Sequence, residues 1–403
     1  MKFIMYGAGN IGRGFIGPLF SQIGYEVVFI DVDKKVVDEL NKRHEYYQEI
    51  IDFNNSKTNK IKNIRAINGT DKEKIAAEIA NADLMATAVG AVILPKIANN
   101  IAYGLQKRWE KNNDVFNILI CENLMNGDEF LKNEIKKHLN ANNIELFSQK
   151  VGIVETCIGR MVPVVPTEKK IKDTLYIAAE PYEMLPIDKA HFLGKLPVTK
   201  KIIPYEPFEF YIQRKLYVHN MAHAICAYLG MRKNLQYIND AIKIPAIRLI
   251  IIGAMQEVLL MLAKKYNVDF NKLYIYMMDL LYRFQNPGLK DTLVRVGRDP
   301  LRKLQPDDRL IGAANNCLQM NIPPIYISIG IAGAIISLIG GADMECNQKN
   351  CEYVLKNICK ITVENSIFKY VNQFFNMFIN KDSYEKMINV ADFLYKKNMG
   401  DII

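Results

Sequence analysis

The first half of the chain alternates short apolar runs with longer amphipathic stretches. Strand-like runs occur at residues 2–6, 26–31, 64–67, 84–89 and 115–121, and helix-like segments lie at residues 34–43, 72–80 and 93–109. The strand-like runs show no polar–apolar alternation, as is typical of a parallel sheet covered on both faces. Strands that alternate in this way with helices predict an α/β domain of Rossmann type with a parallel sheet.

The second half has a different pattern. From about residue 207 to residue 398, apolar positions recur at three- and four-residue spacing, which predicts helices. Residues 151–200 contain several prolines and two short strand candidates, at 152–154 and 174–178. A chain of 403 residues is also longer than a single core usually supports. We therefore expect a dinucleotide-binding domain over residues 1–200, with transitional strands at 151–200, and a mainly helical substrate and catalytic domain over 201–403.

Composition narrows the class of protein. The chain is 50% hydrophobic and 24% charged, which is typical of a globular protein, and its net charge of +9 suits an anionic small ligand. The basic residues are scattered in pairs, so no nucleic-acid partner is expected. The apolar stretches at 249–262 and 324–340 are interrupted or short for a membrane span, so no membrane is expected. The seven cysteines include no CxxC pair, and the N-terminus does not resemble a signal peptide. Together these features predict a cytoplasmic protein with free thiols.

The first strand-like run ends in a glycine motif. Gly7, Gly9 and Gly12 frame the loop that also contains Ala8, Asn10 and Ile11, and a helix-like segment follows. Such glycines allow a tight turn, close approach of a pyrophosphate, and close helix–strand packing. Asp31 ends the second strand, where a carboxylate accepts hydrogen bonds from ribose hydroxyls and repels a 2′-phosphate. The motif predicts NAD as cofactor; the alternative is a glycine-rich turn with an acid nearby by chance.

A helix-like segment in the second half carries a possible catalytic group. With 100° per residue, Lys215, Asn220 and His223 share one broad face of a helix. A lysine desolvated beside a cofactor can exchange protons near neutral pH, an asparagine amide can donate to an alkoxide, and a histidine can orient a hydroxyl. The alternative is a solvated helix face. His219 and His223 are spaced for a metal, but no acid accompanies them, and Cys346, Cys351 and Cys359 fit no zinc pattern, so no metal is expected.

Two further segments contain polar side chains that could contact a ligand. Asn123 follows the strand-like run 115–121, and ligands bind at such strand ends; it could equally be a turn or cap residue. Residues 283–309 are rich in basic side chains, which suits a phosphate. The alternative for that segment is a solvated loop whose basic groups pair with its own acids: Asp291, Asp299, Asp307 and Asp308.

Taken together, the motifs resemble the polyol-specific long-chain mannitol dehydrogenase family. They are GAGNIGRGFIG (7–17), TAVG (87–90), CEN (121–123), RKLYVHNMAHAICAYLG (214–230), RFQNPGLKD (283–291), and RVGRDPLRKL with DRLI (295–311). The resemblance implies NAD-dependent, metal-independent interconversion of D-mannitol 1-phosphate and D-fructose 6-phosphate. We expect a monomer or small homo-oligomer. A sibling activity on an unphosphorylated polyol or sugar acid, of mannitol, fructuronate or tagaturonate type, is the alternative, and a nucleotide-binding sensor without turnover is a further one.

The resemblance also assigns roles to residues. It implies that Lys215 is the general acid/base, that Asn123 and Asn220 form the oxyanion hole, and that His223 helps to position substrate. Gly90 and Asn123 join the cofactor-binding residues. Arg295 and Lys303 match substrate-contacting positions, and we infer that Arg298 and Arg302 hold the phosphate. Two departures stand out: Gly159 precedes Arg160 where the family often has an aspartate, and His219 replaces a usual aliphatic residue.

Overall fold

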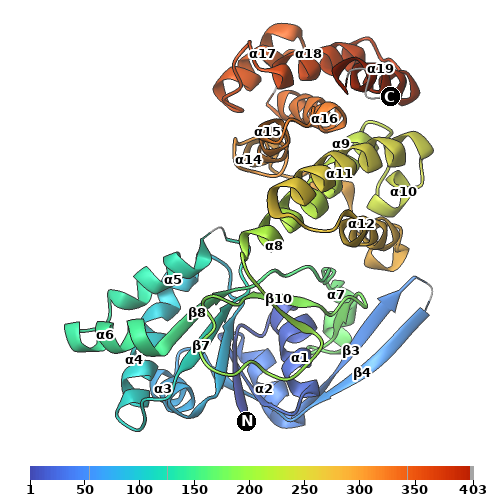
Figure 1. The fold of residues 1–403 in the computed structure, drawn as a ribbon. Helices are drawn as coiled ribbons and strands as arrows, with labels where there is room; N and C mark the ends of the chain where they lie inside the picture. Colours follow the sequence, from blue (N-terminus) through green and yellow to red (C-terminus); the bar gives the residue numbers. More distant parts are fainter. Residues whose placement is uncertain (54, 125, 343, 400–403) are drawn as a thin grey trace. The chain divides into compact units, whose positions relative to one another are not determined.

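The structure is a computed structural model that describes residues 1–53, 55–124, 126–342 and 344–399, so the last four residues of the predicted helical domain lie outside it. The chain divides into two compact units, Met1–Tyr211 and Ile212–Ile403 (Figure 1).

The first unit is built on a parallel six-stranded sheet with the order β5-β2-β1-β6-β7-β8. The strands are β1 Lys2–Tyr6, β2 Glu26–Asp31, β5 Ile64–Asn68, β6 Leu84–Thr87, β7 Phe116–Ile120 and β8 Val151–Glu155. Tyr6 pairs with Ile30 on one side and Thr87 on the other, so these strands end together at one edge of the sheet. The winding direction reverses between β1 and β6, which is where open α/β sheets bind ligands. The predicted α/β class, with a mainly helical part after it, is confirmed.

Helices cover both faces of this sheet. One face, which includes Ile4 and Met85, packs against the helices at the left of Figure 1: α3 Lys72–Asn81, α4 Leu94–Trp109, α5 Gly127–Lys136 and α6 Ala141–Lys150. The opposite face, which includes Phe3 and Phe29, packs against the π-helix η1 Gly12–Ile16, α1 Gly17–Gln22 and α2 Lys34–Arg43. Burial on both sides explains why the strand sequences lack alternation.

Capping groups fix the ends of the predicted helix at 34–43. The Asp33 side chain accepts hydrogen bonds from the backbone N–H groups of Lys35 and Val36, as an N-cap does. At the other end His44 adopts a left-handed conformation with φ of 54°, and this stops the helix.

A second sheet, of order β4-β3-β9, is not predicted by the sequence pattern. Its antiparallel hairpin, β3 Glu45–Asp52 and β4 Asn55–Lys62, forms the pair of long blue arrows in Figure 1, and β9 Ile177–Ala179 runs parallel to β3. The strand expected at 174–178 is shorter and begins at Ile177, because the N–H of Tyr176 bonds to the carbonyl of Asp173 in a turn. The remaining elements of the unit are α7 Thr167–Lys172, β10 Leu185–Asp188 and β11 Ile202–Tyr205.

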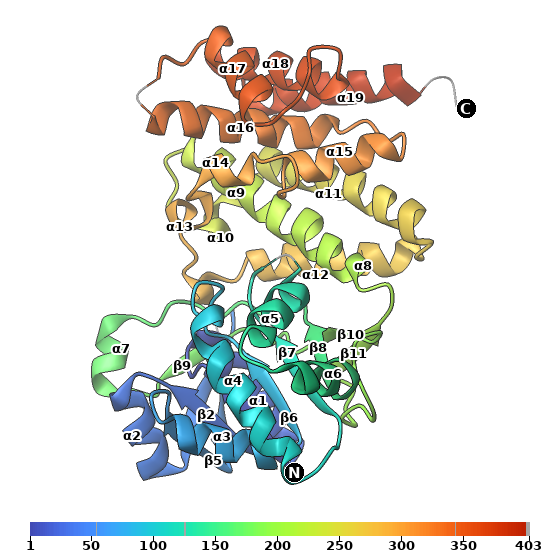
Figure 2. The same cartoon turned by 90° about the vertical axis from the view of Figure 1, so that its left-hand side faces the viewer.

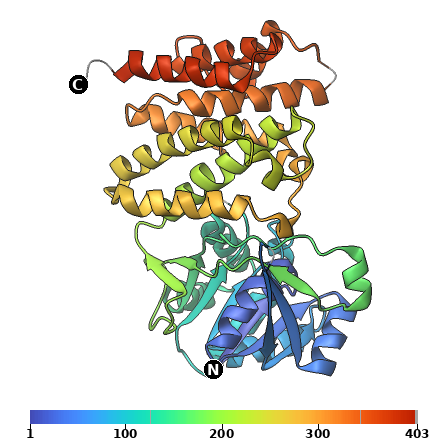
Figure 3. The same ribbon diagram turned by 90° about the vertical axis from the view of Figure 1, so that its right-hand side faces the viewer.

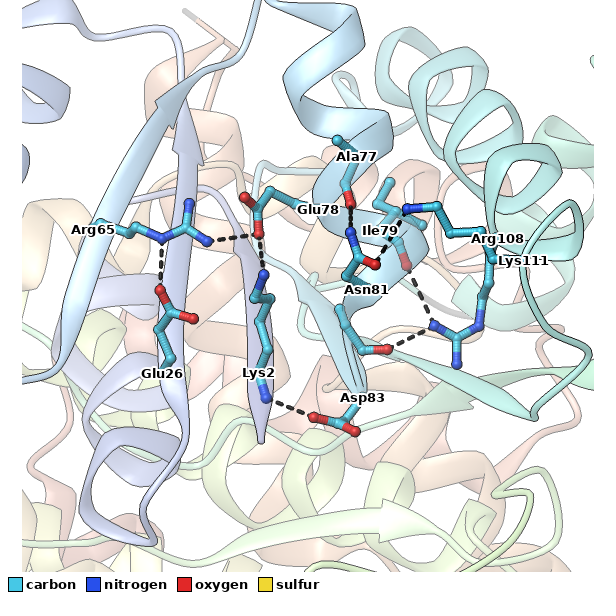
Figure 4. Close-up of polar contacts among 11 residues, drawn as sticks. Lys2, Glu26, Arg65, Ala77, Glu78, Ile79, Asn81, Asp83, Arg108 and Lys111 are labelled. Carbon is cyan, nitrogen blue, oxygen red and sulfur yellow. Dashed lines mark hydrogen bonds and ion pairs between the residues drawn. The ribbon is translucent and has the colours of Figure 1, made fainter.

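Ion pairs tie together the amino-terminal edge of the main sheet (Figure 4). Arg65 pairs with Glu26 at 2.6 Å and with Glu78 at 2.7 Å, and Lys2 also reaches Glu78, at 2.8 Å. The backbone N–H of Lys2 donates to Asp83 at 2.6 Å. This network lies at the strand ends opposite the glycine motif, and it links β1, β2, β5 and α3.

The second unit is helical, and its helices run from yellow-green to red in Figure 3. They are α8 Glu209–Gln213 (which begins just before the unit), the π-helix η2 Arg214–Asn220, α9 Met221–Met231, α10 Ile238–Ala241, α11 Pro245–Tyr266, α12 Phe270–Phe284, η3 Pro287–Leu289, α13 Leu293–Gly297, α14 Pro300–Lys303, α15 Ile311–Gln319, α16 Ile325–Gly341, α17 Gln348–Asn357, α18 Ser366–Ile379 and α19 Tyr384–Met399.

The apolar helix α16 lies at the centre of this unit. It packs against α9 and α11 on one side and against α17, α18 and α19 on the other (Figure 2). Gly330 of α16 allows a close approach to α9, because a β-carbon there would lie 2.3 Å from a side-chain atom of Ile225. By length and composition, α11 is the one described helix that could cross a membrane, yet 61% of its apolar stretch is buried within the protein.

Candidate functional site

The glycine loop at the end of β1 has the geometry that a pyrophosphate needs. Gly7 has φ of +104°, and a β-carbon on Gly12 would lie 2.0 Å from the carbonyl oxygen of Gly7. A β-carbon on Gly9 would meet nothing within 4 Å, so the loop is open on that side. Gly7 and Gly12 are thus required for the turn and its packing, and Gly9 leaves room for a ligand to approach the backbone.

Asp31 lies at the end of β2 beside this loop. Its Oδ2 accepts a hydrogen bond from the backbone N–H of Ala8 at 2.7 Å, and its Oδ1 accepts one from the N–H of Asp33 at 3.0 Å. The structure therefore brings the predicted ribose-binding carboxylate next to the predicted phosphate-binding loop. Asn10 and Ile11 begin the helix that continues into η1.

The buried side chain of Arg13 holds the glycine loop in place, a role that the sequence patterns did not predict. Arg13 is 6% exposed; its Nε donates to the carbonyl of Ala8 at 2.6 Å and its Nη1 to the carbonyl of Leu175 at 2.8 Å. Burial lowers the pKa of Arg13. Tyr46 and Gln48 of β3 donate hydrogen bonds to the carbonyls of Arg13 and Gly14, and so connect the π-helix to the second sheet.

The ends of β6 and β7 are joined by Glu122, which the sequence analysis also missed. Its carboxylate accepts hydrogen bonds from the Thr87 hydroxyl at 2.8 Å and from the Val89 backbone N–H at 3.0 Å. Burial raises the pKa of Glu122, although these hydrogen bonds act against the rise. The contact holds together the loop that contains Gly90, with φ of +88°, and the loop that contains Asn123. Asn123 is exposed, and its amide has no hydrogen-bond partner among the described residues.

Lys215 and Asn220 lie on the π-helix η2, with His223 in the first turn of α9. The expectation of 100° per residue is wrong for residues 214–220, because each residue of a π-helix turns through a smaller angle. Lys215, Asn220 and His223 are all half-buried. The Asn220 amide, like that of Asn123, has no hydrogen-bond partner in the described chain.

His219 and His223 share a packed aromatic cluster with Phe284. The His223 ring stacks on Phe284 with centroids 4.9 Å apart and an angle of 16° between the planes, and the His219 ring lies 5.6 Å from Phe284. His219 is buried, and burial followed by the charges of Arg283, His223, Lys215 and Arg309 lowers its pKa well below the ordinary value. His219 is therefore a neutral core residue close to Lys215. No group of His, Cys, Asp or Glu in the described chain is arranged to hold a metal ion.

Asp291 connects two of the predicted site residues. Its Oδ2 lies 3.0 Å from Nε2 of His223, and its Oδ1 accepts a hydrogen bond from Nε of Arg295 at 2.8 Å. Burial opposes ionisation of Asp291, but the contacts with His223 and Arg295 outweigh it and lower its pKa.

The basic segment, residues 283–309, contains arginines that pair with acidic side chains and, in the described chain, one that does not, Arg298. Arg302 pairs with Asp299 at 3.1 Å and with Asp308 at 2.7 Å, and Arg309 pairs with Asp308 at 2.7 Å, as the alternative of internal ion pairs requires. Arg298 is exposed and has no acidic partner among the described residues. Lys303 is 4% exposed and its ammonium donates to the backbone carbonyl of Arg298. Arg298 is thus the guanidinium in this segment most available to an anion.

Comparison with known proteins assigns most of the chain. Residues 1–201 match the family described as mannitol dehydrogenase Rossmann domain, and residues 208–376 match the mannitol dehydrogenase C-terminal domain. The mannitol-1-phosphate 5-dehydrogenase of Brevibacillus brevis is 37% identical over 83% of this chain and 86% of the relative. That of Bacillus licheniformis is 36% identical over 92% of this chain and 98% of the relative.

A solved structure has the same fold at low identity. Mannitol 2-dehydrogenase of Pseudomonas fluorescens, in a ternary complex with NAD and D-mannitol, superposes with a TM-score of 0.74 at 14% identity, covering 98% of this chain and 94% of that one.

Proposed function

The chain belongs to the mannitol dehydrogenase family, and from this we propose that it is an NAD-dependent dehydrogenase that interconverts D-mannitol 1-phosphate and D-fructose 6-phosphate. The observation that carries the proposal is the 36–37% identity to mannitol-1-phosphate 5-dehydrogenases over most of the chain. Under this proposal residues 1–200 bind the cofactor and residues 201–403 supply the substrate and catalytic groups.

The first unit has residues that fit NAD. The open side at Gly9 suits the pyrophosphate, with Ala8, Asn10, Ile11 and Gly12 around it. The Asp31 carboxylate suits the ribose hydroxyls and disfavours a 2′-phosphate. Gly90 and Asn123, at neighbouring strand ends, complete the set. When bound, the dinucleotide accepts or supplies the hydride.

The residues around Lys215 account for proton transfer. Lys215 acts as general acid in reduction and general base in oxidation, exchanging the proton of the substrate oxygen through Nζ. Asn123 and Asn220 donate to the developing alkoxide; their amides are uncommitted in the described chain, so no existing hydrogen bond must break first. His223 orients a substrate hydroxyl. The scheme uses no metal.

The basic segment accounts for the choice of a phosphorylated sugar. Arg298 binds the phosphate directly, while Arg302, held by Asp299 and Asp308, and Lys303 add positive charge beside it. Arg295 contacts the sugar. We further propose a cytoplasmic enzyme, monomeric or a small homo-oligomer, that binds neither nucleic acid nor membrane.

The test is NADH oxidation, followed by absorbance, with the purified protein and fructose 6-phosphate. Parallel reactions contain fructose, a hexuronate, or NADPH in place of NADH. Turnover with fructose 6-phosphate and NADH alone supports the proposal. Turnover with fructose or a hexuronate instead contradicts phosphate recognition and leaves a sibling dehydrogenase. NADH binding without any turnover contradicts the enzyme and leaves the nucleotide-binding sensor.

A further inference from the structure

Asp291 lies where three parts of the second unit meet. It follows η3, its backbone carbonyl accepts a hydrogen bond from the N–H of Ile238 in α10 at 2.9 Å, and its side chain faces His223 of α9 and Arg295 of α13. The side chain is 10% exposed and its lowered pKa keeps it ionised. A buried carboxylate with its backbone and side chain both fixed is a rigid support for its neighbours.

The two nitrogens of the His223 ring have different surroundings. Nε2 is buried and lies 3.0 Å from Oδ2 of Asp291, although it is not aimed directly at that oxygen. Nδ1 has no hydrogen-bond partner in the described part of the chain. One ring face stacks on Phe284 at 4.9 Å. The ring is thus supported on an edge and a face, and Nδ1 remains available to a ligand.

We propose that Asp291 is a positioning residue for the polyol: it holds the proton of His223 on Nε2, so that Nδ1 accepts a hydrogen bond from a substrate hydroxyl, and it holds Arg295 beside it. The proposal rests on the proposed function, because it takes His223 and Arg295 as substrate contacts. A carboxylate next to one ring nitrogen selects the tautomer with the proton there. Without that charge the proton distributes between both nitrogens. In the molecules that carry it on Nδ1, this nitrogen cannot accept a hydrogen bond from the substrate.

The first experiment needs no substrate. Histidine tautomers are read from long-range ¹H–¹⁵N correlations of imidazole-labelled protein, with His223→Ala used to assign the His223 signals among the 5 histidines. We expect the Nε2–H form in the intact protein and a mixture of forms in Asp291→Asn. A neutral Nδ1–H form in the intact protein, or an unchanged signal in Asp291→Asn, overturns the proposal whatever the enzyme's activity.

The second experiment is a double-mutant cycle on the steady-state reduction of fructose 6-phosphate, with Asp291→Asn, His223→Ala and the double variant. Asp291→Asn should lower kcat/KM by about 10–100-fold, the range seen when the carboxylate behind a metal-bound histidine is removed, with the NADH affinity unchanged. The double variant should lose far less than the product of the two single losses, because both changes remove one contact.

The control for charge loss alone is Asp382→Asn, which removes an aspartate paired with Lys386 at 2.7 Å on another part of the same unit. It should leave kcat/KM near that of the intact protein. If the losses of kcat/KM in the two single variants multiply in the double variant, Asp291 does not act through His223. If Asp291→Asn lowers both kcat/KM and the unfolding temperature while the tautomer of His223 stays the same, Asp291 is structural. If neither the intact protein nor any variant turns over a sugar, the proposed function is wrong. The tautomer measurement still decides whether Asp291 fixes the proton of His223.

Discussion

The buried ammonium of Lys303 donates a hydrogen bond to the backbone carbonyl of Arg298, which joins α14 to the residue that ends α13. Burial, followed by the positive charges of Arg309 and Arg302, lowers the pKa of Lys303 to about 8. The positive charge of the basic segment therefore changes within the pH range in which a metabolic enzyme is assayed.

This pKa predicts a pH-dependent affinity for the phosphorylated sugar. A lysine with a lowered pKa is charged below about pH 8 and loses its charge as the pH rises through that value. The KM for fructose 6-phosphate should therefore rise above about pH 8, because a positive charge near the phosphate is lost. In Lys303→Met, KM should be higher at all pH values and this inflection should be absent. An inflection that survives in Lys303→Met would assign it to another group.

Arg298 and Arg302 should contribute unequally to phosphate binding. Arg298 is exposed and unpaired among the described residues, whereas Arg302 already pairs with Asp299 and Asp308. Arg298→Ala should raise the KM for fructose 6-phosphate by about 10–100-fold, since a hydrogen bond to a charged group is worth roughly 1.5–3 kcal/mol. Arg302→Ala should have a smaller effect. Steady-state kinetics of both variants test this, and a larger effect of Arg302→Ala would reverse the assignment.

Asp31 should determine the choice between NADH and NADPH. Its carboxylate faces the glycine loop through Ala8 and would repel a 2′-phosphate. Asp31→Ser should weaken NADH binding by roughly tenfold, as the loss of charged hydrogen bonds predicts, and should narrow the preference for NADH over NADPH. Fluorescence titration with each cofactor measures both effects.

Asp33→Asn is the matched control for Asp31→Ser, because Asp33 caps α2 through Lys35 and Val36. It should leave the cofactor preference unchanged and the stability nearly so, because asparagine caps a helix about as well as aspartate. A preference that is unaltered in Asp31→Ser would remove Asp31 from the cofactor site.

Glu257 should make the stability of the protein depend on pH. It accepts hydrogen bonds from the Tyr395 hydroxyl of α19 at 2.7 Å and from the N–H groups of Tyr326 and Ile327 at the start of α16. Burial raises its pKa to about 8, against the effect of these bonds. Between the unfolded value of about 4.3 and the folded value, the folded protein retains a proton that the unfolded chain has lost, so the free energy of unfolding falls by up to about 1.4 kcal/mol per pH unit.

Glu257→Gln should flatten this part of the profile in denaturant unfolding between about pH 5 and 9. Glu352→Gln is the matched control, since among the described residues Glu352 forms an ion pair with Lys356 alone, at 3.6 Å and partly exposed. A Glu257→Gln profile as steep as that of the control would show that Glu257 does not titrate in this window.

The sequence predicts the main sheet well because each strand there is buried on both faces and is followed by a helix. It does not predict the hairpin of β3 and β4, because β4 is polar and mostly exposed along its length and is defined by pairing rather than by burial. The π-helices are also missed, since periodicity arguments assume 3.6 residues per turn. Glu122 carries no local signal of its role, because it acts on residues distant in sequence, such as Thr87, 35 positions away. Asp291 has a near partner in Arg295, four positions on, but its contact with His223 joins residues far apart in the sequence.

Stopped-flow absorbance of NADH measures whether Lys215 transfers the proton during hydride transfer. The Lys215→Met variant should reduce fructose 6-phosphate about 10²–10⁴ times more slowly, the usual contribution of a general acid, while binding NADH with nearly the original affinity. Lys264→Met, which removes a lysine that bonds only to the carbonyl of Met320 in the described chain, should react at the original rate. A near-normal rate in Lys215→Met, with NADH bound, would show that Lys215 is not the general acid.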